Sequence, residues 1–150
     1  MIDKSDIMNI VLADDDADDR QLFSAALKEI NAETNLTMFK NGMDLMEFLK
    51  ETEGPLPHII FLDLNMPGKN GRQCLAEIRE RRKFNDISIA IYSTSNAEED
   101  IVATLSGGAN VYIHKPNDFE KLREIVKHVL KINWQYHTSG LNKETFFLSI

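Results

Sequence analysis

The chain has 150 residues, of which 43% are hydrophobic and 27% charged, and its formal net charge at pH 7 is −7. This length suits one compact domain with its own core, and the acidic balance argues against a nucleic-acid or membrane partner. No apolar run could cross a bilayer, and residues 1–8 are too polar for a secretory signal, so we expect a cytoplasmic protein. The single cysteine, Cys74, excludes an internal disulfide and a thiolate zinc motif.

Short apolar runs alternate with stretches of helical spacing along the chain. We predict strands over residues 9–13, 34–39, 59–62, 86–92 and 109–114. A helix is expected after each strand: one opening at Ala17, one after Gly42, one over 71–82, one capped by Asn96 with Glu99, and one capped by Asn117 with Glu120. Strands that alternate with helices in this way predict an α/β fold with a mostly parallel sheet covered on both faces.

The residues that can carry chemistry stand where the predicted strands end. They are Asp14 to Asp16 after the first strand, Asp63 after the third, Ser93 and Thr94 after the fourth, and Lys115 after the fifth. Ligands of such sheets bind outside the carboxyl ends of the strands, so we expect these groups to share one edge. Two carboxylates about 4 Å apart repel by roughly 4 kcal/mol at an effective dielectric near 20, and the acids therefore need a cation. An all-oxygen ligand set favours Mg²⁺ (or Mn²⁺).

A carboxylate at this edge could also act as a nucleophile and form an aspartyl phosphate, with a lysine and a hydroxyl facing the phosphoryl group. Taken singly, each residue has a simpler interpretation. Asp14 to Asp19 could cap a helix, Asp63 could form a turn, and Lys115 could be solvated. Their common position at strand ends favours a joint site.

In this order the motifs resemble the receiver domain of response regulators in two-component signalling. The resemblance covers about residues 8 to 132 and is carried by Asp14-Asp15, Asp63-Leu64-Asn65-Met66-Pro67 with Gly71, Ser93-Thr94, Gly108-Ala109, Tyr112 and Lys115-Pro116. It implies a flavodoxin-like (βα)5 fold, with a doubly wound parallel five-stranded sheet of order 2-1-3-4-5. Trp134 and the segments around Asn65 and Asn96 are similar to stand-alone receivers paired with phytochrome-like sensor kinases.

The resemblance implies a role for each strand-end acid. Asp63 would be the phosphoacceptor, and Mg²⁺ (or Mn²⁺) would be held by Asp14, Asp15, Asp63 and the backbone carbonyl of Asn65. The phosphoryl donor would be a sensor histidine kinase or a phosphotransfer protein. The chain would then be a signalling phosphoprotein rather than an enzyme.

The resemblance also implies how the phosphoryl group is sensed. Lys115 would contact it, and Ser93, with Thr94 beside it, would be the switch hydroxyl, because 30 residues separate Asp63 from Ser93 and 22 separate Ser93 from Lys115. Tyr112 would rotate inward after phosphorylation. Asn65 and Ser95 resemble positions that tune dephosphorylation, and Pro116 would follow a cis peptide bond.

Two alternatives and one segment stay open. A haloacid dehalogenase-type Mg-dependent phosphatase also uses a strand-end aspartate, but it needs a second acid where this chain has Asn65. A receiver-like binding module that is never phosphorylated is the other alternative. We assign residues 1–133 to the receiver domain and 134–150 to a C-terminal extension without a separate output domain. The apolar extension is expected either to pack on the domain or to form a homodimer or partner contact.

Overall fold

Strands and helices alternate along the part of the chain that the computed structural model describes, which is residues 7–30, 33–139 and 148–149, with side chains up to residue 132. The strands are β1 Met8–Ala13, β2 Thr34–Phe39, β3 Ile59–Leu62, β4 Ser88–Ser93, β5 Val111–His114 and β6 Leu148–Ser149. The α-helices are α1 Ala17–Glu29, α2 Gly42–Glu51, α3 Gly71–Arg79, α4 Glu98–Ser106 and α5 Phe119–Ser139. A short 3-10 helix, Arg82–Phe84, follows α3.

The strands form one parallel sheet of order β2-β1-β3-β4-β5-β6. The predicted order of the first five strands, 2-1-3-4-5, is confirmed. The sixth strand was not predicted, because a two-residue strand leaves no alternation in the sequence. It extends the sheet beyond β5, where Val111 lies opposite Leu148 and Tyr112 opposite Ser149.

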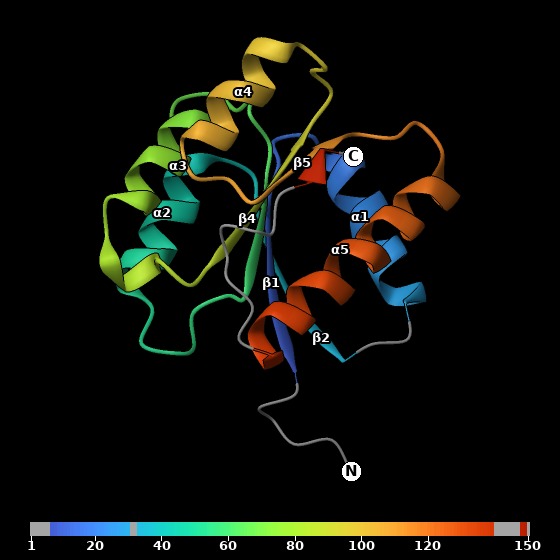
Figure 1. The fold of residues 1–150 in the computed structure, drawn as a ribbon, viewed down its shortest axis with the longest axis horizontal. Helices are drawn as coiled ribbons and strands as arrows, with labels where there is room; N and C mark the ends of the chain where they lie inside the picture. The colour runs from blue at the N-terminus through green and yellow to red at the C-terminus, as the bar shows by residue number, and fades with distance from the viewer. Residues whose placement is uncertain (1–6, 31–32, 140–147, 150) are drawn as a thin grey trace.

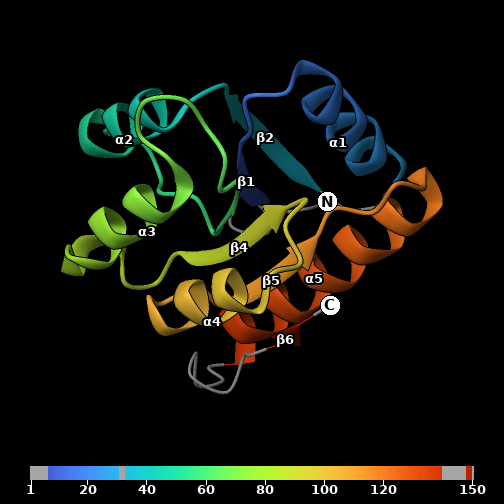
Figure 2. The same ribbon diagram turned by 90° about the horizontal axis from the view of Figure 1, so that it is seen from above.

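Helices cover both faces of the sheet (Figure 1, Figure 2). α1 and α5 lie together on one face, and α2, α3 and α4 lie on the other. Because successive residues of a strand point to opposite faces, Phe61 of β3 faces α1 and α5, whereas Ile60 and Leu62 face the other three helices. Phe23 of α1 packs edge-on against Phe61, with ring centroids 4.9 Å apart. The sheet is thus fixed from both sides, which holds its carboxyl edge in place.

Two predicted helix caps are wrong, each by a shift of a single residue. The N-cap of α4 is Ala97, which has no side-chain cap, and the hydroxyl of Ser95 accepts the Ala97 N–H at 3.2 Å instead. At α5 the N–H of Glu120 donates to the carboxylate of Asp118 at 2.9 Å, where Asn117 was expected to cap. Several polar residues precede each of these helices, and the sequence alone does not decide which of them bonds to the first backbone N–H groups.

Arg79 is the last residue of α3, which ends three residues before the predicted boundary at 82. Its guanidinium donates to the backbone carbonyls of Gly108 and Ile87 at 2.9 Å and of Phe84 at 3.2 Å. The side chain therefore ties the end of α3 to the segments that lead into β4 and β5. These segments are also where the strands begin later than predicted, at Ser88 and Val111.

The last helix crosses the predicted domain boundary. α5 continues to Ser139, so the division between residues 133 and 134 falls inside a helix rather than at a break in secondary structure. Residues 140–147 and 150 of the expected extension lie outside the described residues. Within the described ranges, no helix combines the length and the apolarity that crossing a membrane requires.

Cys74 is buried between α2 and α3, and its thiol lies 3.7 Å from the carbonyl of Gly42. Burial raises the pKa of this thiol to about 11, only partly offset by the positive charge of Lys69. We expect alkylation by iodoacetamide at pH 8 to be at least about 100-fold slower in the folded than in the urea-unfolded protein, since thiolate is the reacting species. Mass spectrometry over time measures this ratio. Similar rates in the two states would contradict the placement of Cys74.

Candidate functional site

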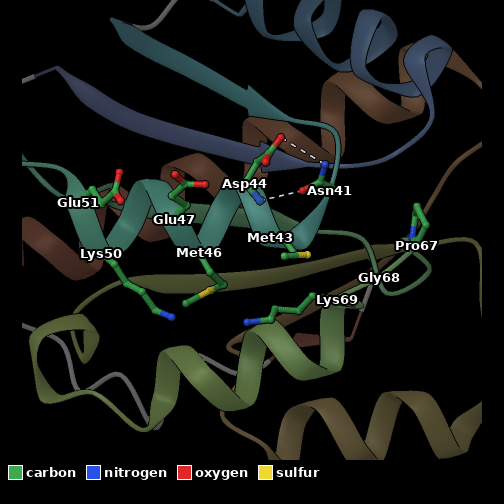
Figure 3. Close-up of a pocket in the computed structure, with 10 residues that line it drawn as sticks. All are labelled: Asn41, Met43, Asp44, Met46, Glu47, Lys50, Glu51, Pro67, Gly68 and Lys69. Atoms are coloured by element: carbon green, nitrogen blue, oxygen red, sulfur yellow. Dashed lines mark hydrogen bonds between the residues drawn. The ribbon is translucent and has the colours of Figure 1, made fainter.

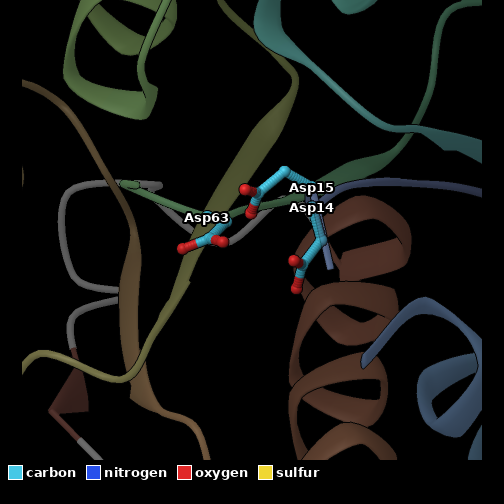
Figure 4. Close-up of side chains that lie close together, drawn as sticks. All are labelled: Asp14, Asp15 and Asp63. Atoms are coloured by element: carbon cyan, nitrogen blue, oxygen red, sulfur yellow. The ribbon is translucent and has the colours of Figure 1, made fainter. Parts of the chain in front are cut away.

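Three of the predicted metal ligands lie together at the carboxyl edge of the sheet (Figure 4). One carboxylate oxygen from each of Asp14, Asp15 and Asp63 lies within 4.8 Å of the others. Asp14 is 0% exposed and Asp63 4% exposed, whereas Asp15 is open to solvent. Asp14, Asp15 and Asp63 thus form a small cluster, called the acidic pocket below, in which Asp14 and Asp63 are buried and Asp15 is exposed.

Backbone hydrogen bonds of the sheet orient these acids. The N–H of Asp63 donates to the carbonyl of Ala13 at 2.9 Å, and the N–H of Asp14 donates to the carbonyl of Phe39 at 3.0 Å. Each acid thus continues the hydrogen-bond ladder by one residue past its strand. Asn65, which is exposed, donates its backbone N–H to the Asp63 carboxylate at 3.3 Å. Its carbonyl stays a predicted ligand.

Gly71 allows α3 to start directly against the end of β3. A Cβ at this position would lie 2.2 Å from the carbonyl oxygen of Asp63 and 2.8 Å from the Cα of Leu64. The Gly71 N–H donates to the carbonyl of Leu64 at 3.1 Å, which closes the turn. The glycine of the predicted motif therefore serves close backbone approach next to Asp63.

The pocket has the ligand chemistry of a divalent-cation site. One carboxylate oxygen of Asp14, Oδ2, is buried and accepts no hydrogen bond within the described residues, although it lies 2.8 Å from Nζ of Lys115 in an ion pair. The single ammonium of Lys115 is shared among Asp14, Asp19 and Asp63, so buried negative charge is left over that a further cation would offset. Together with the all-oxygen donor set, it fits a hard cation held by Asp14, Asp15 and Asp63.

Lys115 reaches into the pocket from the end of β5 and contacts three carboxylates. Its Nζ lies 2.8 Å from Asp14, 2.9 Å from Asp19 and 3.4 Å from Asp63, and its side chain is 8% exposed. Burial by itself would lower the pKa of this ammonium, but its close contacts with the carboxylates of Asp14 and Asp19 outweigh burial and raise the pKa. The sequence placed Lys115 beside the phosphoryl group of Asp63 but missed its contact with Asp19, for which it offered only a possible part in capping a helix.

Burial is the main cause that raises the pKa of Asp63 to about 6, and the negative charge of Asp14 adds to it. The ammonium of Lys115 and the N–H of Asn65 act in the opposite direction. The lysine therefore offsets only part of the cost of holding two buried acids side by side.

The switch residues lie at the end of β4 and in β5. Ser93 is fully buried and its hydroxyl accepts the N–H of Ser95 at 3.1 Å, whereas Thr94 is exposed. Tyr112 is 1% exposed, and its hydroxyl donates to the carbonyl of Ser95 at 2.7 Å. That the ring rotates inward after phosphorylation stays a prediction, because this structure shows one position of the ring and not a movement. The ring is already inside, because that hydrogen bond and the apolar core around it stabilise the position.

Ser95 also contacts an ion pair that joins α3 and α4 near the pocket. Its hydroxyl donates to the carboxylate of Asp100 in α4 at 2.5 Å, and Arg72 of α3 forms an ion pair with the same carboxylate. The hydrogen bond from Ser95 and the charge of Arg72 both lower the pKa of Asp100. The segment between β4 and α4 is therefore held by α3, α4 and β5 together.

The predicted cis peptide bond before Pro116 is wrong, because the Lys115–Pro116 bond is trans. A trans bond is the intrinsically favoured form of an X–Pro peptide by roughly 0.5–1 kcal/mol. The N–H of Lys115 still donates to the carbonyl of Ser93 at 2.7 Å and thereby fixes the lysine beside β4.

An open groove of about 610 Å³ lies beside the site, between α2 and the loop that follows β3 (Figure 3). The side chains of Lys50 and Lys69 approach each other across it, and both contact Glu77 of α3. Its lining is Asn41, Met43, Asp44, Met46, Glu47, Lys50, Glu51, Pro67, Gly68 and Lys69. The acids and the lysine of the pocket do not contribute to it.

Comparison with known proteins identifies the family. Residues 10–127 match the response regulator receiver domain. The chain is 31% identical over 124 residues to the response regulator Rcp1 of Synechocystis sp., covering 80% of this chain and 84% of that protein. It is 25% identical over 123 residues to a chemotaxis protein CheY homolog of Campylobacter jejuni, covering 82% of this chain and 92% of that protein.

Two solved structures share the fold and the sequence similarity. The Mn²⁺-bound form of Rcp1 superposes with a TM-score of 0.74 at 30% identity, covering 81% of this chain and 91% of that one. The phosphorylated cyanobacterial phytochrome response regulator RcpA superposes with a TM-score of 0.78 at 29% identity, covering 90% and 96%. The chain therefore belongs to the response regulator receiver family of two-component signalling. The predicted similarity to receivers of phytochrome systems is also confirmed.

Proposed function

We propose that Asp63 accepts a phosphoryl group from a phosphohistidine of a sensor histidine kinase or a phosphotransfer protein. The observation that carries this proposal is the meeting of Asp63 with two further acids and Lys115 in one pocket. A carboxylate oxygen of Asp63 forms the new O–P bond while the P–N bond of phosphohistidine breaks. The leaving imidazole takes up a proton, so atoms and charges balance.

The side chains around Asp63 have separate roles in this proposal. Asp14, Asp15 and Asp63 would hold Mg²⁺, with the carbonyl of Asn65 as a further ligand, and the bound cation would neutralise charge at the phosphoryl oxygens. Rcp1, whose solved form contains Mn²⁺, supports a divalent ion of this kind. Lys115 lies 3.4 Å from Asp63 and is placed to bind one phosphoryl oxygen.

The signal leaves the pocket through the end of β4. The buried hydroxyl of Ser93 would exchange its bond with the Ser95 N–H for one with the phosphoryl group. This exchange loosens the Ser95 segment, whose carbonyl holds Tyr112 and whose hydroxyl holds Asp100. The affected surface is then α4 and β5. Asn65 and Ser95 stay the predicted positions that tune dephosphorylation.

Phosphorylation of Asp63 is tested with acetyl phosphate and Mg²⁺, followed by intact mass measurement. We expect the wild type to gain one phosphoryl group and Asp63→Asn to gain none. Asp44→Asn is a matched control, because Asp44 is an exposed acid of α2 outside the pocket, and it should be phosphorylated like the wild type. EDTA should abolish the gain. A phosphorylated Asp63→Asn variant, or a wild type inert beside active receivers, would contradict the proposal.

The remaining predictions concern the surroundings of the domain. The family match favours a signalling protein over the haloacid dehalogenase alternative. That the protein is not an enzyme and that it is cytoplasmic both stay predictions, and its downstream target is not identified. A homodimer formed through the extension also stays a prediction. Sedimentation of the full chain against one that ends at Ser139, which keeps α5 whole, tests it.

A further inference from the structure

Lys115 is bound more closely by an acid of α1 than by the predicted phosphoacceptor. Its Nζ lies 2.9 Å from Asp19 but 3.4 Å from Asp63. These two acids reach the lysine from opposite elements, since Asp19 belongs to the first turn of α1 and Asp63 follows β3. A lysine that must bind a phosphoryl group on Asp63 is therefore partly held elsewhere.

The backbone of Asp19 is fixed by the cap of α1. Asp16 caps α1, and its carboxylate accepts the backbone N–H groups of Asp18 at 2.8 Å and of Asp19 at 3.1 Å. This cap fixes the first turn of the helix and with it the position from which Asp19 reaches Lys115. Asp18, the preceding residue, is exposed and makes no ion pair within the described residues.

The two close partners of Lys115 differ in how easily they can release it. Asp14 is 0% exposed, so if Lys115 moved away, water could not solvate the buried Asp14 carboxylate in its place. The Asp19 side chain is 31% exposed, and water can solvate its carboxylate as soon as the lysine leaves. Asp19 is thus the partner that an incoming anion displaces, whereas Asp14 keeps the ammonium at the pocket.

We infer that Asp19 is a positioning residue that competes with the phosphoryl group for Lys115 and thereby slows the phosphorylation of Asp63. The inference rests on the proposed function of Asp63. Before phosphorylation Asp19 draws the ammonium toward α1, and its negative charge repels anionic phosphoryl donors at the open side of the pocket. After transfer it competes with the phosphoryl oxygens for the same ammonium.

The test compares Asp19→Asn with Asp18→Asn. Both changes replace one carboxylate in the first turn of α1 by an amide of the same size. The loss of favourable charge at the helix N-terminus is therefore the same in the two variants. With acetyl phosphate at saturating Mg²⁺, Asp19→Asn should be phosphorylated about two- to fivefold faster than wild type, the range typical of a partly exposed ion pair. Asp18→Asn should match the wild type. Equal rates for the two variants, or a slower Asp19→Asn, overturn the inference.

A second measurement follows the lysine without any phosphoryl donor. The side-chain ammonium signal of Lys115, assigned by its loss in Lys115→Arg, is recorded by ¹⁵N-resolved NMR. We expect Asp19→Asn to shift this signal and to speed its proton exchange with water, and Asp18→Asn to leave it unchanged. A signal insensitive to Asp19→Asn overturns the inference. If the wild type gains no phosphoryl group, the proposed function of Asp63 fails. If the wild type is phosphorylated but the Asp19→Asn variant behaves like it, only the inference on Asp19 fails.

Discussion

Replacement of Lys115 by methionine should lower the free energy of unfolding in EDTA by about 3–5 kcal/mol, the usual cost of leaving buried charges without their partner. The variant keeps the length of the side chain but leaves Asp14, which is 0% exposed, and Asp63, which is 4% exposed, without a cation. Saturating Mg²⁺ should restore most of the loss, because an ion bound only to the folded state stabilises it. Urea unfolding with EDTA and with Mg²⁺ measures both effects.

Lys50→Met provides the control for this prediction. Lys50 also pairs with an acid, Glu77, but at 3.5 Å and with a side chain 37% exposed. Its replacement should cost less than about 1 kcal/mol and should be insensitive to Mg²⁺. If Lys115→Met lost the same stability with and without Mg²⁺, repulsion between the pocket acids would not be the cause.

Gly71→Ala should destabilise the fold by about 1–3 kcal/mol and weaken Mg²⁺ binding, since overpacking against fixed atoms forces the backbone to move. The new Cβ would lie 2.2 Å from the Asp63 carbonyl oxygen and 2.8 Å from the Leu64 Cα, and neither atom can rotate away. The start of α3 or the end of β3 must therefore shift, and the second movement displaces Asp63. Urea unfolding and a Mg²⁺ titration measure the two consequences.

Gly54→Ala tests whether any glycine-to-alanine change has this effect. A Cβ at Gly54 meets only the hydroxyl of Thr52 at 3.7 Å, which is an ordinary contact. We expect its stability and Mg²⁺ affinity to stay at wild-type values. Unchanged Mg²⁺ affinity in a destabilised Gly71→Ala would show that α3 moves and that Asp63 stays in place.

The sequence could predict the acidic pocket because strand ends are marked by abrupt changes in polarity. Four buried apolar residues, Ile59–Leu62, stop at Asp63, and the apolar run of β1 stops at Asp14. Once the strands are assigned as parallel, their carboxyl ends share one edge, and the acids meet without further information. Polarity and topology therefore place Asp14 to Asp16 and Asp63 at one edge, and only the resemblance to receivers singles out Asp14, Asp15 and Asp63 as the ligands.

The contacts of Lys115 and Ser95 could not be predicted in the same way. Asp19 and Lys115 are 96 residues apart, and their ion pair depends on the rotation of α1 about its axis. Several acids lie close to Ser95 in the sequence, and the sequence does not show that its hydroxyl bonds to Asp100. Nor does it show that Arg72 of α3 pairs with the same acid. Such pairings depend on side-chain direction, which hydrophobic periodicity does not encode.

The inward position of Tyr112 and the trans bond before Pro116 show a second limit. Both concern a choice between two local states, and the contacts around the residue decide between them. For Tyr112 the deciding contact is a single hydrogen bond to a loop carbonyl, that of Ser95. The sequence identified the residues but not the states that they occupy.

The two edges of the sheet differ in which strand covers them, since the two-residue strand β6 pairs with β5 at one edge and β2 is the last strand at the other. Along β5 the backbone groups of Val111 and Tyr112 face Leu148 and Ser149, so a partner that recognises β5 by adding an extended peptide must first displace β6. On the opposite edge β2 pairs only with β1 among the described strands, and its sequence Thr-Asn-Leu-Thr-Met-Phe alternates polar and apolar residues only in part. Strand addition, by a partner or by another copy during aggregation, therefore meets less competition at β2.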